Sequence, residues 1–183
     1  MKKNGFAVWL TGLPGAGKSV IAEALQHQLG QNGIETQILK TDELRSYITP
    51  EPKYTDKERQ LVYNAFSYMA KLLVENGINV IMDATGNLRK YRALAKEIIP
   101  NYNEVYLKCP LEVAMKREMK RADTKGAPQN IYKKALEGKA DNVPGIQAEY
   151  EEPSEPMLTI RTDKHSIEEC AKKIYKLLTN GFQ

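Results

Sequence analysis

Cysteine, histidine and long apolar runs are scarce in this sequence of 183 residues, and each scarcity excludes a class of protein. The only cysteines are Cys109 and Cys170, without C-x-x-C spacing, so we expect buried reduced thiols in a cytoplasmic protein rather than a disulfide framework. His27 and His165 have no partner at metal-ligand spacing. No apolar run approaches the roughly 20 residues of a membrane span, and no signal peptide is evident, so we expect no membrane association.

Charge of one sign is not concentrated anywhere in the chain. The net charge is +4, but lysine and arginine are scattered among acidic residues, without a polybasic tail or stripe. We therefore expect no nucleic-acid partner, while a mild positive balance suits a small anionic substrate. Neither an internal repeat nor a low-complexity tract is present, so we treat residues 1–183 as a single domain.

Residues 12–19 read G-L-P-G-A-G-K-S and fit the phosphate-binding pattern G-x-x-x-x-G-K-[ST], the P-loop. An apolar stretch at 6–11 precedes them and a helical pattern at 17–29 follows, which is the strand–turn–helix context that such a loop needs. A glycine-rich turn that binds nothing is the alternative. We expect Lys18 to contact the β- and γ-phosphates of ATP and Ser19 to bind Mg²⁺. The predicted nucleotide-binding residues are Gly12, Leu13, Pro14, Gly15, Ala16, Gly17, Lys18, Ser19 and Val20.

Strand and helix patterns alternate along the chain and predict an α/β fold. The fold class that fits is a P-loop NTPase three-layer sandwich, with five parallel strands in the order 2-3-1-4-5 and helices on both faces. The predicted strands are 6–11, 35–40, 78–82, 104–109 and 157–160, and the predicted helices are 17–29, 55–76, 87–99, 110–121 and 166–180, with N-terminal caps at Thr55, Asn87 and Ser166. Residues 42–54 are predicted to be mostly loop, with a helical turn.

Residues 122–156 break this alternation. They are rich in lysine, glycine, proline and glutamate, with one short helix predicted near 131–136. A segment this long inside a compact fold is typical of a functional lid, and a disordered insertion is the alternative.

Two aspartates follow predicted strands at the edge where the P-loop lies. Asp83 ends an apolar strand and can bind Mg²⁺ beside Ser19, or it can cap the next turn. Asp42 can accept a proton from an attacking hydroxyl as the catalytic base, or it can cap a helical turn.

Residues just beyond Asp42 are suited to an anionic acceptor. Arg45 and Arg59 carry guanidinium groups that match sulfate or phosphate oxygens, although a solvated helix face would also contain such arginines. Tyr54 lies between them in the sequence and can stack on a base. Trp9, by contrast, is predicted to be in the core.

At this point the sequence resembles the adenylylsulfate (APS) kinase family. The resemblance rests on V-W-L-T-G-L-P-G-A-G-K-S at 8–19, on D-E-L-R at 42–45, which is similar to the family's D-N-x-R, and on three lid segments. These are I-Y-K-K-A at 131–135, G-I at 145–146 and Y-E-E-P at 150–153. The resemblance spans most of the chain.

The resemblance implies a cytoplasmic enzyme of sulfate assimilation that moves the γ-phosphoryl group of Mg·ATP to the ribose 3′-hydroxyl of APS. It makes Asp42 the catalytic base and Arg45 and Arg59 ligands of the substrate anion, beside the catalytic Lys18 and the metal ligands Ser19 and Asp83 that the motifs themselves predict. Dimers are common in the family, so it also implies a homodimer.

The sequence departs from the family on the acceptor side. The family's D-G-D-N is K-T-D-E at 40–43, its F-I-S-P is replaced by D-A-T-G-N at 83–87, and its lid phenylalanine is Val143. We expect Tyr54, Thr85, Asn87 and Ile146 to contact the acceptor. D-A-T is similar to other small P-loop kinases, including sugar and polynucleotide 5′-kinases.

The alternative acceptors are therefore another nucleotide, a phosphosugar or a 5′-hydroxyl polynucleotide, although the acidic run at 149–152 disfavours the last. A GTPase is disfavoured because no N-K-x-D motif is present. A binding module without catalysis is disfavoured by the intact set of Lys18, Ser19, Asp42 and Asp83.

Overall fold

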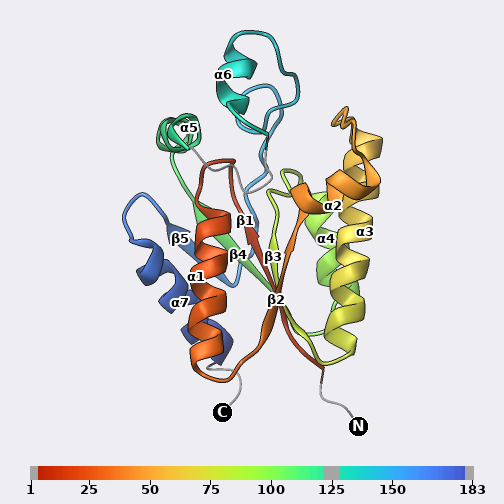
Figure 1. Cartoon of the computed structure of the whole chain (residues 1–183), viewed down its shortest axis with the longest axis vertical. Coiled ribbons are helices and arrows are strands. Elements are labelled where there is room, and N and C mark those ends of the chain that lie inside the picture. The colour runs from red at the N-terminus through yellow and green to blue at the C-terminus, as the bar shows by residue number, and fades with distance from the viewer. Residues whose placement is uncertain (1–3, 122–127, 180–183) are drawn as a thin grey trace.

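A computed structural model describes residues 4–121 and 128–179 (Figure 1). Strands and helices alternate along the chain as the sequence pattern predicts. The elements are β1 Ala7–Thr11, α1 Lys18–Gln31, β2 Thr36–Lys40, α2 Thr41–Ile48, α3 Asp56–Glu75, β3 Asn79–Asp83, α4 Arg89–Ile98, β4 Tyr102–Lys108, α5 Leu111–Lys120, α6 Ile131–Leu136, β5 Leu158–Arg161 and α7 Ile167–Thr179.

The five strands form one parallel sheet in the order β2-β3-β1-β4-β5, which confirms the predicted topology. The register places Lys40 of β2 and Leu10 of β1 on either side of Asp83 of β3. Because parallel strands end at the same edge of a sheet, the P-loop after β1, Asp42 after β2 and Asp83 meet at one edge.

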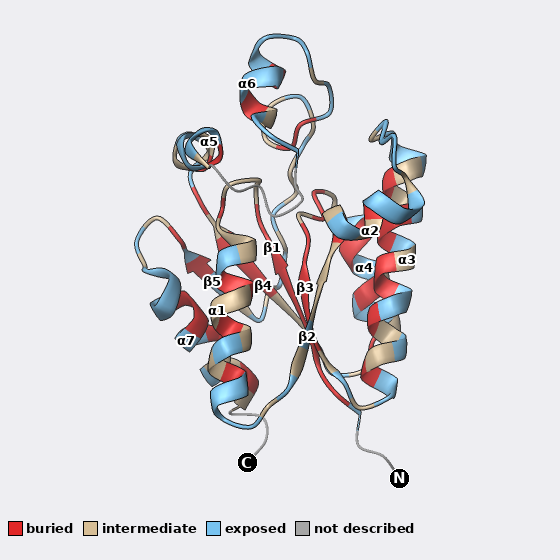
Figure 2. Cartoon of the chain, viewed as in Figure 1, coloured by how far each residue is buried: buried red, intermediate tan, exposed pale blue. Residues whose placement is uncertain are grey.

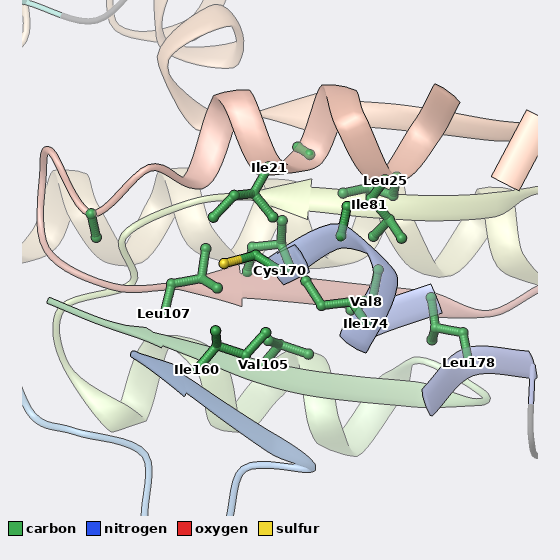
Figure 3. Close-up of a cluster of buried hydrophobic side chains, with 14 of the residues drawn as sticks. Val8, Ile21, Leu25, Ile81, Val105, Leu107, Ile160, Cys170, Ile174 and Leu178 are labelled. Carbon is green, nitrogen blue, oxygen red and sulfur yellow. The ribbon is translucent and has the colours of Figure 1, made fainter. Parts of the chain in front are cut away.

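Two hydrophobic layers enclose the sheet. Helices α1 and α7 cover one face, where Val8, Leu25 and Ile174 belong to one buried cluster (Figures 1 and 3). Helices α3 and α4 cover the other face, where Trp9 and Phe66 belong to a second cluster. The helices are buried on their inner sides and exposed on their outer sides (Figure 2). All five residues of β1 are buried because this central strand is covered on both faces.

Helix α2 differs from the prediction of mostly loop over 42–54. It has eight residues and begins directly after β2, so no linker residues mark the change in the sequence. Asp42 and Glu43 lie in its first turn, where their negative charge interacts favourably with the helix dipole. Asp42 is therefore a first-turn residue, and the capping alternative for it is wrong because Lys40 holds the N-cap position.

Two of the three predicted helix caps are present in the structure, and the third is not. Ser166 and Glu169 form a reciprocal capping box, and the Thr55 hydroxyl accepts a hydrogen bond from the Glu58 amide, as predicted. The prediction that Asn87 caps α4 is wrong, because Leu88 is the N-cap residue and makes no side-chain capping bond. The Asn87 side chain is instead bonded to other segments, as described below.

Two glycines provide a matched test of the P-loop backbone. Gly15 has a φ of 79°, and a Cβ there would lie 2.2 Å from the carbonyl oxygen of Ala114, so Gly15→Ala should lower the free energy of unfolding by about 1–3 kcal/mol. Gly30 lies in α1 with open space around it, so Gly30→Ala should raise that free energy by about 0.5–1 kcal/mol. Urea unfolding monitored by circular dichroism measures both, and equal effects would contradict the P-loop packing.

Candidate active site

The P-loop joins β1 to α1 and exposes the start of the helix. Gly15 and Gly17 have positive φ values of 79° and 97°, which lets the backbone turn sharply before α1 begins at Lys18. No described side chain caps this helix start. Its first amides are therefore available to an anion, and the helix dipole adds to the attraction. This arrangement suits a phosphate group.

Lys18 is partly buried at the centre of the site. Its Nζ donates hydrogen bonds to the carbonyl oxygens of Gly12 and Leu13, both at 3.1 Å. Burial lowers the pKa of Lys18, while the negative charges of Asp83 and Asp42 oppose that shift. The ammonium group is thus held near two carboxylates.

Asp42 and Asp83 are close enough to influence one another electrostatically. Burial raises the pKa of the Asp42 carboxyl group, the charge of Asp83 raises it further, and Lys18 and Arg45 act in the opposite direction. The Asp83 side chain belongs to a residue that is only 7% exposed. The structure therefore brings together the predicted base, the predicted metal ligand and the P-loop lysine.

The donor set near Asp83 fits Mg²⁺ bound together with phosphates. Within residues 4–121 and 128–179, no group of three or more histidine, cysteine, aspartate or glutamate side chains could hold a metal ion. Mg²⁺ in phosphate-binding sites usually takes one or two carboxylates and completes its coordination with water and phosphate oxygens. Asp83 and the hydroxyl of Ser19 are suited to be the few protein ligands that such a Mg²⁺ ion needs.

The loop that follows Asp83 is fixed by side chains from the core. Trp9 Nε1 donates to the carbonyl oxygen of Ala84 at 2.9 Å, and Thr11 Oγ1 donates to that of Thr85 at 2.6 Å. The amide of Gly86 donates to the hydroxyl oxygen of Tyr63 at 3.0 Å. Trp9 is fully buried, as predicted, but it also supports this loop, a role that no local sequence signal indicates.

Arg45, Tyr54 and Arg59 come together as the sequence predicts. The Arg45 guanidinium lies 4.7 Å from the centre of the Tyr54 ring, and that of Arg59 lies 5.6 Å from it. Both arginines are only 7% exposed, so the alternative of a solvated helix face is wrong. Arg45 Nη1 also donates to Glu58 Oε1 at 2.6 Å, in a pair that is largely shielded from solvent.

The described part of the predicted lid, residues 128–156, lies against the P-loop. The hydroxyl of Tyr132 in α6 donates to the carbonyl oxygen of Pro14 at 3.0 Å. Val143 is buried with Tyr132, and Ile146, a predicted acceptor contact, packs against this cluster. The first lid residues, 122–127, lie outside the described part of the chain. Residues 128–156 are therefore packed against the P-loop, and their function as a lid stays a prediction.

Sequence reasoning missed two residues of this site. Arg121 follows α5, and its positive charge lowers the pKa of both Lys18 and Asp42, which places it near them. A cation at the entry to a predicted lid was the available signal. The Tyr150 hydroxyl is 2.9 Å from Thr11 Oγ1, at the base of the P-loop. Tyr150 begins the lid segment Y-E-E-P, which supports the family resemblance but predicts no role for this residue.

A pocket of about 450 Å³ adjoins the P-loop between the lid and the ends of β4 and β5. It is lined by Leu13, Tyr106, Lys108, Cys109, Pro110, Leu111, Gly145, Tyr150, Glu152 and Arg161. None of the predicted acceptor residues is part of its lining, so the pocket and the Arg45–Tyr54–Arg59 group are separate features of the same edge.

Comparisons with known proteins agree with this architecture. The family model described as adenylylsulphate kinase matches residues 4–161. An adenylyl-sulfate kinase of Halothermothrix orenii is 38% identical, over 96% of this chain and 90% of that protein, and a probable adenylyl-sulfate kinase of Archaeoglobus fulgidus is 36% identical, over 87% and 97%. The structure of the Mycobacterium tuberculosis APS kinase CysC in complex with AMPPNP and APS has a TM-score of 0.85 and 30% identity, covering 96% of this chain and 98% of that one. The chain belongs to the adenylylsulphate kinase family.

Proposed function

We propose that this protein is an ATP-dependent kinase that transfers the γ-phosphoryl group of ATP to the 3′-hydroxyl of adenylyl sulfate. The observation that carries the proposal is the meeting of Lys18, Asp42 and Asp83 at the P-loop edge, in a chain of this family. The solved structure of the Mycobacterium tuberculosis APS kinase CysC, which this chain resembles, is in complex with AMPPNP and APS. The proposed setting is sulfate assimilation in the cytoplasm.

On the donor side, residues 12–20 and the uncapped start of α1 would bind the phosphates of ATP. Lys18 would move from the carbonyl oxygens of Gly12 and Leu13 to the β- and γ-phosphates. Ser19 and Asp83 would hold Mg²⁺, which when bound neutralises charge on the phosphates. Phosphoryl transfer depends mainly on such positioning and charge stabilisation.

On the acceptor side, Asp42 would accept the proton of the attacking hydroxyl. A raised pKa makes its carboxylate a stronger base than an ordinary aspartate, which favours this role. Arg45 would bind the acceptor's anionic group, Tyr54 would stack on its base, and Thr85 and Ile146 would border it. Arg59 and Asn87 stay predictions as acceptor ligands, and their contacts within the protein are considered in the next subsection.

The homodimer belongs to the same proposal. The outer side of α3 exposes four large apolar residues spaced along the helix, with Leu61 59%, Tyr68 55%, Leu72 42% and Met69 39% exposed. An exposed apolar stripe of this kind is a common feature of a protein interface.

No helix among the described residues is long and apolar enough to cross a membrane.

Release of ADP tests the proposed reaction. The protein should release ADP from ATP when APS is supplied, and Lys18→Ala should slow that release by about 10²–10³-fold, because it removes a charge aimed at the transferring group. Lys172→Ala, at an exposed position of α7, is the control and should leave the rate unchanged.

Other acceptors belong in the same assay. If APS does not accelerate ADP release but a nucleotide, a phosphosugar or a 5′-hydroxyl oligonucleotide does, the acceptor assignment is wrong. If no acceptor accelerates it, the kinase proposal is wrong.

Asp42→Asn separates catalysis from stability. The variant should slow transfer by about 10²–10⁴-fold because the base is lost. It should also raise the free energy of unfolding at pH 7, because a carboxyl group with a raised folded-state pKa destabilises the fold when it is ionised. That gain should disappear as the pH falls below about 3.9, where Asp42 is protonated in both states.

Glu43→Gln is the matched control, since Glu43 is the exposed neighbour in the same turn. It should leave stability unchanged or lower it by up to about 1 kcal/mol through the lost helix-dipole interaction. Urea titrations between pH 3 and pH 8 measure both variants. Destabilisation by Asp42→Asn at pH 7 would contradict the assignment of a destabilising buried charge.

A further inference from the structure

Arg59 is bonded in three directions to three different segments. Its Nε donates to the carbonyl oxygen of Tyr54 at 3.0 Å, its Nη1 to Asn87 Oδ1 at 3.0 Å and its Nη2 to the carbonyl oxygen of Asn142 in the lid at 2.6 Å. All three partners are neutral oxygen atoms. The guanidinium therefore joins the start of α3, the loop after β3 and the lid, and its positive charge is not cancelled by these contacts.

Asn87 extends the same connection. Its Oδ1 accepts from Arg59, and its Nδ2 donates to the carbonyl oxygen of Glu149 at 2.9 Å. The side chain is almost fully buried, at 3% exposure, so both bonds are shielded from water. Arg59 and Asn87 thus hold two points of the lid, the carbonyl groups of residues 142 and 149.

These two points flank the part of the lid nearest the P-loop. Val143 and Ile146 lie between them, and Gly145 packs against the Leu13 side chain. Asn142 has a φ of 62°, a left-handed conformation that asparagine tolerates, and its carbonyl group is the one that Arg59 holds. The base of the lid is fixed separately, because Arg92 Nη2 donates to the carbonyl oxygen of Glu151 at 2.7 Å.

We propose that Arg59 and Asn87 form a clamp that holds residues 142–149 of the lid closed over the loop at 84–87. Arg59 then acts as a positioning residue through the lid, besides its predicted role as a ligand of the acceptor. Closure also fixes the uncancelled guanidinium charge beside Tyr54 and Arg45. The consequence for phosphoryl transfer rests on the proposed function, whereas the clamp is a property of the protein alone.

Hydrogen exchange of the protein without substrates tests the clamp directly. Asn87→Ala removes both bonds of Asn87, and Arg59→Lys replaces a planar fork with a single point donor that cannot reach three segments. Each variant should accelerate amide exchange in peptides covering residues 142–149 by about tenfold or more, the effect of losing a charge-assisted hydrogen bond. Asn64→Ala, on the exposed side of the same helix, is the control and should leave this exchange unchanged.

Asn87→Asp separates the two bonds of the clamp. An aspartate still accepts from Arg59 but cannot donate to Glu149, so exchange should rise less than in Asn87→Ala. This variant also decides the question if Arg59→Lys fails to fold, as judged by circular dichroism.

Kinetics provide a second readout that a purely structural role would not change in the same way. If Arg59 acted only as a direct ligand, Arg59→Lys would raise KM for the acceptor, without faster lid exchange in the absence of substrates. A clamp instead predicts that Arg59→Lys and Asn87→Ala lower kcat together. Unchanged lid exchange in both variants would overturn the clamp, while absence of ADP release by the unaltered protein would overturn only the proposed function.

Discussion

The central strand β1 is buried on both faces, and the rest of the molecule depends on that burial. Its residues face α1 and α7 on one side and α3 and α4 on the other, so it positions both hydrophobic layers. It also leads directly into the P-loop and supplies Trp9 and Thr11, which hold the loop after β3. One strand therefore couples the core, the phosphate site and the acceptor side.

The buried charges at the carboxyl edge of the sheet destabilise the fold and favour the proposed phosphoryl transfer. Lys18 and Asp42 are both partly removed from water. Burial lowers the pKa of Lys18 and raises the pKa of Asp42, so each shift favours the uncharged form. Their mutual attraction offsets part of that cost, and Arg45 and Arg121 do the same for Asp42, whereas the positive charge of Arg121 adds to the cost for Lys18. Active sites commonly contain groups with such shifted pKa values, because a group whose charged form is destabilised readily exchanges a proton or binds an ion.

Most of the acceptor side is held by hydrogen bonds from side chains to backbone carbonyl groups. Trp9, Thr11 and Arg59 each donate to the backbone of a segment distant in sequence, and Tyr63 accepts from the amide of Gly86. These bonds depend on the path of the backbone rather than on particular side chains. The loop at 84–87 and the lid can therefore differ in sequence from other members of the family while keeping their positions.

The fold class and the strand order followed from the sequence alone, and the sequence also predicts which residues form the donor side of the site. The period of the apolar residues identified the strands and helices, and the P-loop spacing has a local backbone requirement that a short motif can express. The start of α2 directly after β2 was not predicted, because no linker residues mark it in the sequence. Contacts in the folded chain were needed to show that Asn87 bonds to Arg59 and the lid instead of capping α4, and that Arg121 and Tyr150 lie at the site. These features depend on contacts between residues tens of positions apart, and side-chain pairing over such distances leaves no periodic or local pattern in a single sequence.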